Sequence, residues 1–191
     1  MHQETSTSIE LVQRLRRGDA GAYQLIVDQW HHRVFNFALR YSNDQHFASE
    51  VVQKTFIQVF EKIDQLKDPS KLKSWLYKIA SNNCYNEGRI KARVHFSALD
   101  EQVPHRLDME TPAKKYENAE LKSLVENMLQ KIPSEQRQVI IMKEYEGLKF
   151  REIAEILGES ENTIKSRMYY GLDAMRKILN NNNLSKDIYH E

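Results

Sequence analysis

Apolar residues recur at three- and four-residue steps along most of this chain, which is the period of amphipathic helices. In the first half, this pattern predicts four helices, running approximately over residues 7–18, 20–41, 45–63 and 71–85. Thr7 and Glu10 have the spacing of a capping box at the start of the first helix. Asp19 and Asp44 stand where the next helices need N-terminal caps.

The same period returns in the second half and predicts four more helices, approximately over residues 116–132, 134–147, 150–158 and 160–179. Pro133 and Ser134 are placed to end the first of these helices and to cap the second, and Ser160 is placed to cap the last. No run long enough to form a strand shows strict alternation. Residues 94–115 hold two prolines and no sustained apolar stripe, which is typical of a linker. We therefore predict an all-α fold with two small helical domains, residues 1–93 and 116–191, joined by a flexible linker at 94–115.

Composition narrows the class of protein. The 191 residues are 40% hydrophobic and 29% charged, as in a soluble helical protein. A single cysteine, Cys84, excludes an internal disulfide and a cysteine-based zinc site. The apolar runs are too short to span a membrane, and no secretion signal is visible, so we expect a cytoplasmic protein without membrane insertion. No nucleotide-binding loop or metal-ligand motif occurs, so we expect no enzyme, cofactor, metal or small-molecule substrate.

Charge is segregated along the chain although the net charge is only +1. Residues 71–93 hold six cations and one acid, whereas residues 97–120 hold three cations and six acids. Such blocks suggest surfaces for different partners, but charge alone is equally compatible with two solvated faces.

Residues 150–169 have the spacing of a helix-turn-helix. Ala154 is small enough for two helices to cross, Gly158 opens the turn, and Ile164 and Met168 seat the second helix. The N-terminal side chains of such a helix reach base edges in the DNA major groove, whereas cations beside them bind phosphates. The candidate DNA-binding residues are Ser160, Asn162, Thr163, Lys165, Ser166, Arg167 and Tyr169. The alternative is a helical hairpin with a solvated charged face.

A second group mixes cations, an aromatic ring and amides on the fourth predicted helix. Aromatic faces stack on unpaired bases and amides bond to base edges, so this mixture suits a single strand. The candidates are Lys71, Lys73, Trp75, Lys78, Asn82, Asn83, Asn86 and Arg89. The competing interpretation places Trp75 in the core, as is usual for aromatics at helical spacing.

Three blocks together resemble the bacterial RNA polymerase sigma factors of the sigma-70 family, in the extracytoplasmic-function (ECF) group. Residues 51–56, Val-Val-Gln-Lys-Thr-Phe, are similar to the family's core-binding segment D-L-V-Q-E-T-F. Residues 72–82, Leu-Lys-Ser-Trp-Leu-Tyr-Lys-Ile-Ala-Ser-Asn, resemble the −10 block F-x-x-W-L-Y-x-I-A-x-N. Residues 129–167 resemble the −35-binding domain. The resemblance covers residues 8–180.

The resemblance implies a protein that brings core RNA polymerase to a promoter and holds the opened −10 strand. It places the helix-turn-helix on −35 duplex DNA and the loop 67–71 around a flipped base. It implies contacts with the clamp helices and flap of polymerase, and control by an anti-sigma factor. The residues carried over to the clamp helices are Glu50, Gln53, Lys54, Phe56, Ile57 and Phe60.

Two departures from the family pattern lead to expectations of their own. Lys54 stands where the family has Glu, so a salt bridge there is lost or reversed, and Glu159 replaces an apolar residue, which is expected to loosen the turn. Two alternatives stay open. One is a LuxR-like regulator that binds duplex DNA unaided, and the other is a helical adaptor that binds only protein.

Overall fold

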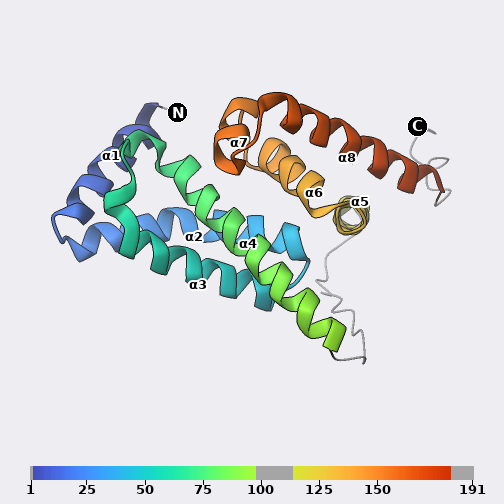
Figure 1. Cartoon of the computed structure of the whole chain (residues 1–191), viewed down its shortest axis with the longest axis horizontal. Coiled ribbons are helices and arrows are strands. Elements are labelled where there is room, and N and C mark those ends of the chain that lie inside the picture. The colour runs from blue at the N-terminus through green and yellow to red at the C-terminus, as the bar shows by residue number, and fades with distance from the viewer. Residues whose placement is uncertain (1, 98–113, 182–191) are drawn as a thin grey trace.

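The computed structural model describes residues 2–97 and 114–181, with side chains for residues 7–91 and 120–181, and every regular element in these ranges is helical (Figure 1). The first group of elements is α1 (His2–Arg16), α2 (Ala20–Ser42), α3 (Gln45–Lys62), the 3₁₀ turns η1 (Ile63–Gln65) and η2 (Pro69–Lys71), and α4 (Leu72–Ser97). The second is α5 (Lys114–Gln130), α6 (Ser134–Ile140), the π-helical turn η3 (Ile141–Tyr145), α7 (Phe150–Leu157) and α8 (Glu161–Asn181). The predicted all-α class is confirmed.

In the first group, α2, α3 and α4 pack against one another, and α1 packs against α2 (Figure 1). Apolar side chains at helical spacing meet in the interior, where Ile26, Phe37 and Leu76 are fully buried. Tyr77 is also fully buried, and its ring lies edge-on to Phe37 with centroids 5.5 Å apart.

Short polar side chains begin several helices as predicted. Asp19 accepts hydrogen bonds from the backbone of Gly21 and Ala22, and Asp44 accepts one from Phe47 N at 3.0 Å. The capping box at Thr7 is wrong, because α1 already begins at His2. Ser134 also does not cap α6; it is the first helical residue, and the cap position holds Pro133.

The helices beside the predicted linker extend into it. Helix α4 runs to Ser97, four residues past the predicted boundary, and α5 begins at Lys114, inside the predicted linker. The rest of the predicted linker, residues 98–113, lies outside the described residues.

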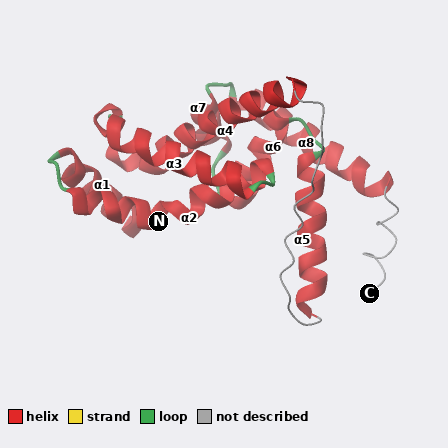
Figure 2. Cartoon of the chain, turned by 90° about the horizontal axis from the view of Figure 1, so that it is seen from below, coloured by secondary structure: helices red, strands yellow, loops and turns green. Residues whose placement is uncertain are grey.

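The second group lies against the first. Helix α7 packs on α4, and η3 packs on α2. Helix α5 also contacts α2, but most of its length projects away from the N-terminal helices (Figure 2). Arg137 Nη1 donates to Tyr41 O at 2.6 Å, and Gln138 Nε2 donates to Ser81 Oγ at 2.6 Å. The two groups therefore share polar contacts along α2 and α4.

The turn between α7 and α8 depends on Gly158, whose φ of +70° lies in the left-handed region. We predict that Gly158→Ala lowers the free energy of unfolding by about 1 kcal/mol, since a Cβ disfavours this conformation. Chemical denaturation of the full chain followed by circular dichroism measures the change.

Gly88 supplies the matched control. It lies within α4, and an added Cβ would meet only Tyr41 Oη at 3.8 Å, an ordinary contact. Gly88→Ala should be neutral or stabilising by up to about 1 kcal/mol, because alanine favours helix. Equal effects of the two substitutions would contradict the role of the left-handed turn.

Candidate nucleic-acid interface

One face of α4 collects most of the predicted single-strand residues. Lys78, Asn82, Asn86 and Arg89 follow one another at steps of three and four residues and are all exposed. Trp75 begins this row but is only partly exposed, and it packs against the core. The row therefore combines cations and amides in solvent with one aromatic ring that also supports the helix.

Asn83 is a correction to the predicted set. It is 5% exposed, since one helical step turns it about 100° away from Asn82. Its Nδ2 donates to Thr55 Oγ1 at 3.1 Å, and its Oδ1 accepts from Gln58 Nε2 at 3.2 Å. Asn83 thus joins α4 to α3 and has no surface to offer a strand.

Tyr85 belongs to the open face, although the sequence reasoning passed over it. Its side chain is 51% exposed, and the Arg89 guanidinium lies 5.7 Å from its ring centroid. The sequence does contain a signal for this placement. Tyr85 lies three residues after Asn82 and four before Arg89, which is the spacing of residues on one face of a helix. An exposed ring beside a cation is suited to stacking on a base.

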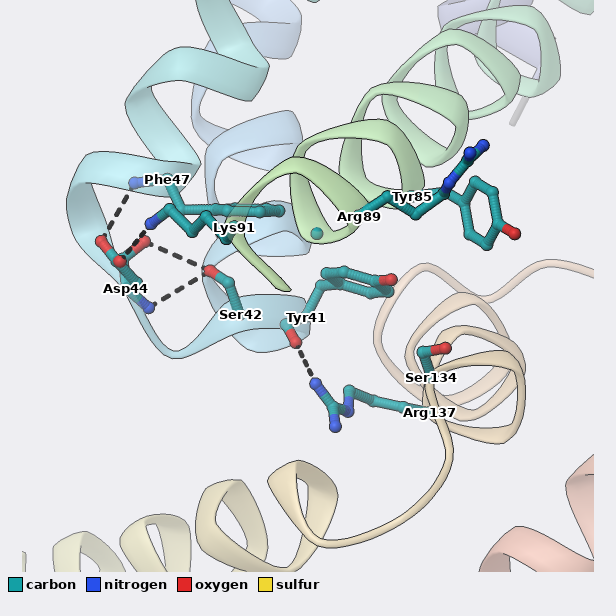
Figure 3. Close-up of a pocket in the computed structure, with 10 residues that line it drawn as sticks. Tyr41, Ser42, Asp44, Phe47, Tyr85, Arg89, Lys91, Ser134 and Arg137 are labelled. Atoms are coloured by element: carbon teal, nitrogen blue, oxygen red, sulfur yellow. Dashed lines mark hydrogen bonds and ion pairs between the residues drawn. The ribbon is translucent and has the colours of Figure 1, made fainter. Parts of the chain in front are cut away.

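Tyr85 and Arg89 also border a hollow of about 380 Å³ between α4, the α2–α3 corner and the start of α6 (Figure 3). Tyr41 and Arg137 lie on its other sides. Burial raises the pKa of the Tyr41 phenol and lowers the pKa of the Arg137 guanidinium. The Arg137 side chain is fixed in position by hydrogen bonds, including one that it donates to Gln130 O at 2.9 Å.

Lys71 and Lys73, at the start of α4, contact the C-terminal helices. Lys71 Nζ lies 3.2 Å from Glu155 Oε2 on α7, and Lys73 Nζ donates to Glu146 O at 2.7 Å. Both predicted phosphate ligands therefore have partners inside the chain.

Helices α7 and α8 form the predicted helix-turn-helix. Ala154, Ile164 and Met168 are buried where the helices cross. Ser160 Oγ accepts a hydrogen bond from Thr163 N at 3.0 Å, so Ser160 caps the N-terminus of α8. The exposed face of α8 carries Asn162, Lys165, Ser166 and Tyr169, and the Tyr169 side chain is 68% exposed.

Acids beside this face hold both of its predicted phosphate ligands. Lys165 Nζ is 2.7 Å from Glu161 Oε1, and Arg167 Nη2 is 2.7 Å from Glu159 Oε1. Glu159 was expected to loosen the turn, but it braces the turn to α8 instead. The Arg167 side chain is only 26% exposed, so its first role is structural.

The outer face of α3 presents a separate surface. Gln53, Lys54, Ile57 and Phe60 are exposed, and Phe60 meets the Tyr23 ring edge-on at 5.2 Å. Phe56 is a second correction, because it is 5% exposed and belongs to the core. Leu25 on α2, 47% exposed, is another exposed apolar side chain of the N-terminal helices, and the sequence reasoning did not single it out.

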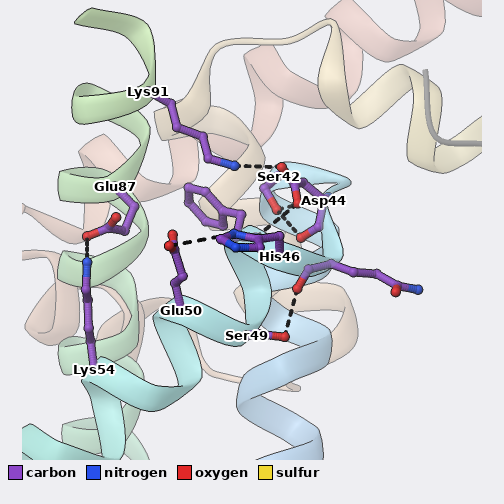
Figure 4. A network of polar contacts seen from close by, with 10 residues as sticks. Ser42, Asp44, His46, Ser49, Glu50, Lys54, Glu87 and Lys91 are labelled. Atoms are coloured by element: carbon purple, nitrogen blue, oxygen red, sulfur yellow. Dashed lines mark hydrogen bonds and ion pairs between the residues drawn. The ribbon is translucent and has the colours of Figure 1, made fainter. Parts of the chain in front are cut away.

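Lys54 has an intramolecular partner. Its Nζ lies 2.5 Å from Glu87 Oε1 on α4, and the Glu87 side chain is only 11% exposed (Figure 4). Glu50 lies 3.6 Å from His46 Nδ1 on the same helix. The residue change at position 54 therefore creates an ion pair between α3 and α4.

Comparison with protein families assigns both groups of helices. A model described as sigma-70 region 2 matches residues 26–94, and one described as sigma-70, region 4 matches residues 122–175. Together the matches cover more than half of the chain. The chain belongs to the sigma-70 family.

Curated relatives agree along nearly the whole length. The chain is 29% identical over 178 residues to the RNA polymerase sigma-H factor of Pseudomonas aeruginosa, covering 89% of this chain and 92% of that protein. It is 29% identical over 182 residues to the ECF RNA polymerase sigma-E factor of Escherichia coli, covering 90% and 94%. It is 27% identical to the ECF RNA polymerase sigma factor SigW of Bacillus subtilis, covering 88% and 94%.

Solved structures show the same fold. The sigma factor RpoE of Bartonella quintana, in complex with the anti-sigma factor NepR, superposes with a TM-score of 0.67 at 23% identity, covering 83% of this chain and 96% of that one. CnrH, in complex with the cytosolic domain of CnrY, superposes with a TM-score of 0.67 at 20% identity, covering 91% and 97%.

Within the described ranges, no helix is both long and apolar enough to cross a bilayer. The same ranges hold no group of three or more histidine, cysteine or acidic side chains suited to a metal ion.

The Lys54–Glu87 pair yields a stability prediction. Lys54→Ala leaves a mostly buried carboxylate without its cation, so the free energy of unfolding should fall by about 1–2 kcal/mol, less than for a fully buried pair since Lys54 is half exposed. Lys62→Ala, on the same helix, should change it by less than about 0.5 kcal/mol. Indistinguishable denaturation curves for the two variants would contradict the importance of this pair.

Proposed function

We propose that this protein is a sigma factor that binds core RNA polymerase, recognises the −35 and −10 elements of a promoter and promotes DNA opening. The observation that carries the proposal is that one member of the family exposes two chemically different polar faces, on α8 and on α4. The α8 face suits a major groove, and the α4 face, with its amides and aromatic rings, suits an unpaired strand.

The residues divide the task as follows. The residues assigned to the −35 duplex are Asn162, Lys165, Ser166, Arg167 and Tyr169. Those assigned to the −10 strand are Lys71, Lys73, Trp75, Lys78, Asn82, Asn86 and Arg89. The exposed α3 residues Gln53, Ile57 and Phe60 dock on the clamp helices of polymerase, and the C-terminal domain contacts the flap. Phe56 and Asn83 support these faces from the interior.

Tethering explains how modest contacts reach useful affinity. With polymerase holding the protein, the second DNA contact becomes intramolecular and gains from a high effective concentration. We place residues 98–113 within the linker between the two domains. The protein has no catalysis of its own in this scheme and acts in the cytoplasm.

An anti-sigma factor is proposed as the controlling partner. The Bartonella quintana relative was solved with an anti-sigma factor. In this chain, Ile57 and Phe60 are exposed apolar side chains that such a partner would cover, in competition with polymerase.

The LuxR-like alternative requires tight duplex binding by the protein alone and assigns no role to the α4 face. Footprinting with and without core polymerase separates the two functions. We expect a specific footprint only when polymerase is present.

Contacts of α8 can be tested by removing its cations. Lys165→Ala combined with Arg167→Ala should weaken −35 binding by the polymerase complex and reduce the slope of log affinity against log salt by about 1–2, roughly one for each lost phosphate contact. Filter binding across a salt series measures both quantities.

Lys122→Ala on α5 is the control for general charge, and it should leave the salt slope unchanged. A helical adaptor that binds only protein predicts no effect of the α8 double variant on function. That result would remove the DNA-binding role.

Two neighbouring asparagines on α4 test the −10 role. Asn82→Ala should reduce open-complex formation, measured by permanganate reactivity, while leaving the unfolding free energy within about 0.5 kcal/mol of the original, because Asn82 is exposed. The same change at Asn83 should lower the unfolding free energy by about 1–3 kcal/mol, since it deprives the buried Thr55 hydroxyl of its partner. Normal promoter opening with Asn82→Ala would refute its contact with the strand.

A further inference from the structure

The start of α4 and the η2 residue before it form one of the places where the two halves of the protein meet. Lys71 and Lys73 face α7 and η3, and both were assigned to nucleic acid on the basis of sequence. Glu155 holds the first, and the Glu146 backbone carbonyl holds the second. A phosphate and these oxygens therefore need the same ammonium groups.

Tyr77 of α4 completes the contact. The Tyr77 hydroxyl donates a hydrogen bond to the Glu146 carboxylate, one turn along α4 from Lys73. Tyr77 is fully buried, so its hydroxyl needs a partner inside the protein. We call Lys73, Tyr77 and Glu146 the latch.

The backbone around Glu146 is unusual. The π-helical turn η3 ends one residue before Glu146, and π turns are rare insertions that often mark functional positions. The wider turn ends against α2, where the Arg40 guanidinium lies 4.2 Å from the Tyr145 ring centroid. Local geometry thus presents Glu146 to α4.

The Glu146 carboxyl of the latch lies in a partly buried site, between cations and a polar hollow. Burial raises the pKa of the Glu146 carboxyl, an effect opposed by the Tyr77 hydrogen bond and by the cations Arg40, Lys73 and Arg33. Burial beside Glu146 likewise raises the pKa of Tyr77. A polar hollow of about 430 Å³ borders the carboxylate, so water can replace the lost contacts when the halves separate.

We propose that the free protein is autoinhibited by this latch: the C-terminal half closes on α4, and the −10 strand must displace it from Lys71 and Lys73. The inference rests on the proposed function, because it concerns access to the same strand-binding face. Binding of the strand and closure of the latch oppose each other, and by linkage each weakens the other to the same extent.

The test compares two variants that break the same hydrogen bond from opposite sides. Tyr77→Phe keeps the packed ring and the net charge, whereas Glu146→Ala removes the acceptor. Each should strengthen binding of a single-stranded oligonucleotide carrying a −10-like sequence by about tenfold without polymerase, in line with the loss of one hydrogen bond to a charged group. Fluorescence anisotropy measures this binding, and a thermal melt verifies that each variant is folded.

A distance measurement reports on the closure itself. Dyes on Gln13→Cys and Asn180→Cys, both exposed positions, report the separation of the two halves by energy transfer. Cys84 can stay, since it is fully buried and burial raises the pKa of its thiol, which leaves little reactive thiolate. We expect lower transfer efficiency in both latch variants than in the dye-labelled parent.

Two control variants distinguish the effect of breaking the latch from the effects of a changed net charge and of a missing hydroxyl. Glu144→Ala removes an exposed acid two residues from Glu146, and Tyr170→Phe removes an exposed hydroxyl. Neither should change transfer efficiency or oligonucleotide affinity. If Glu144→Ala raises affinity as much as Glu146→Ala, the effect is general charge and the proposal is overturned.

The remaining outcomes are equally decisive. Unchanged energy transfer in both latch variants would show that the latch does not hold the halves together. Separation without stronger strand binding would show that closure does not inhibit. Run-off transcription by the parent protein with core polymerase is scored separately, so failure of the sigma-factor function itself is recognised independently.

Discussion

The structure depends on helix α4 having two packed sides and one side in solvent. One side packs against α3, a second meets the C-terminal helices, and a third stays in solvent with Lys78, Asn82 and Arg89. Polar residues on the packed sides must find partners, because an unpaired buried polar group destabilises the fold by about 1–3 kcal/mol. Asn83 and Glu87 find them on α3, and Tyr77 finds one on the C-terminal half. These pairs fix the rotation of α4, and that rotation decides which residues face solvent.

How far the sequence predicts the molecule follows from the range of the interactions involved. Helices and their caps depend on neighbours within four residues, and so Asp19, Asp44 and Ser160 were assigned correctly. The helix-turn-helix spacing also identified the α7–α8 crossing at Ala154 and Ile164. These features depend on residues close together in the sequence, so they can be predicted from the sequence alone.

The predictions for single residues were wrong where the rotation of a helix, or a partner far away in the sequence, decides whether a side chain is exposed. Asn82 and Asn83 look alike in sequence, but the packing of α4 on α3 exposes one and buries the other. Phe56 was assigned to a surface by family position, although it completes the core. The Tyr77–Glu146 contact joins residues far apart in the chain, so no spacing rule could predict it. The partner of Lys54 was hidden for the same reason.

Ion pairing has a consequence for the proposed function. Lys71, Lys165 and Arg167 each lie beside a glutamate, so in that function nucleic acid competes for cations that already have partners. The ion pairs of Lys71 and Lys165 are about half exposed and contribute little stability, so a phosphate can displace them at small cost. The affinity that remains for either DNA face alone is correspondingly reduced. A protein built in this way gains strong binding only when a larger assembly engages both faces together, which limits unproductive association with DNA elsewhere.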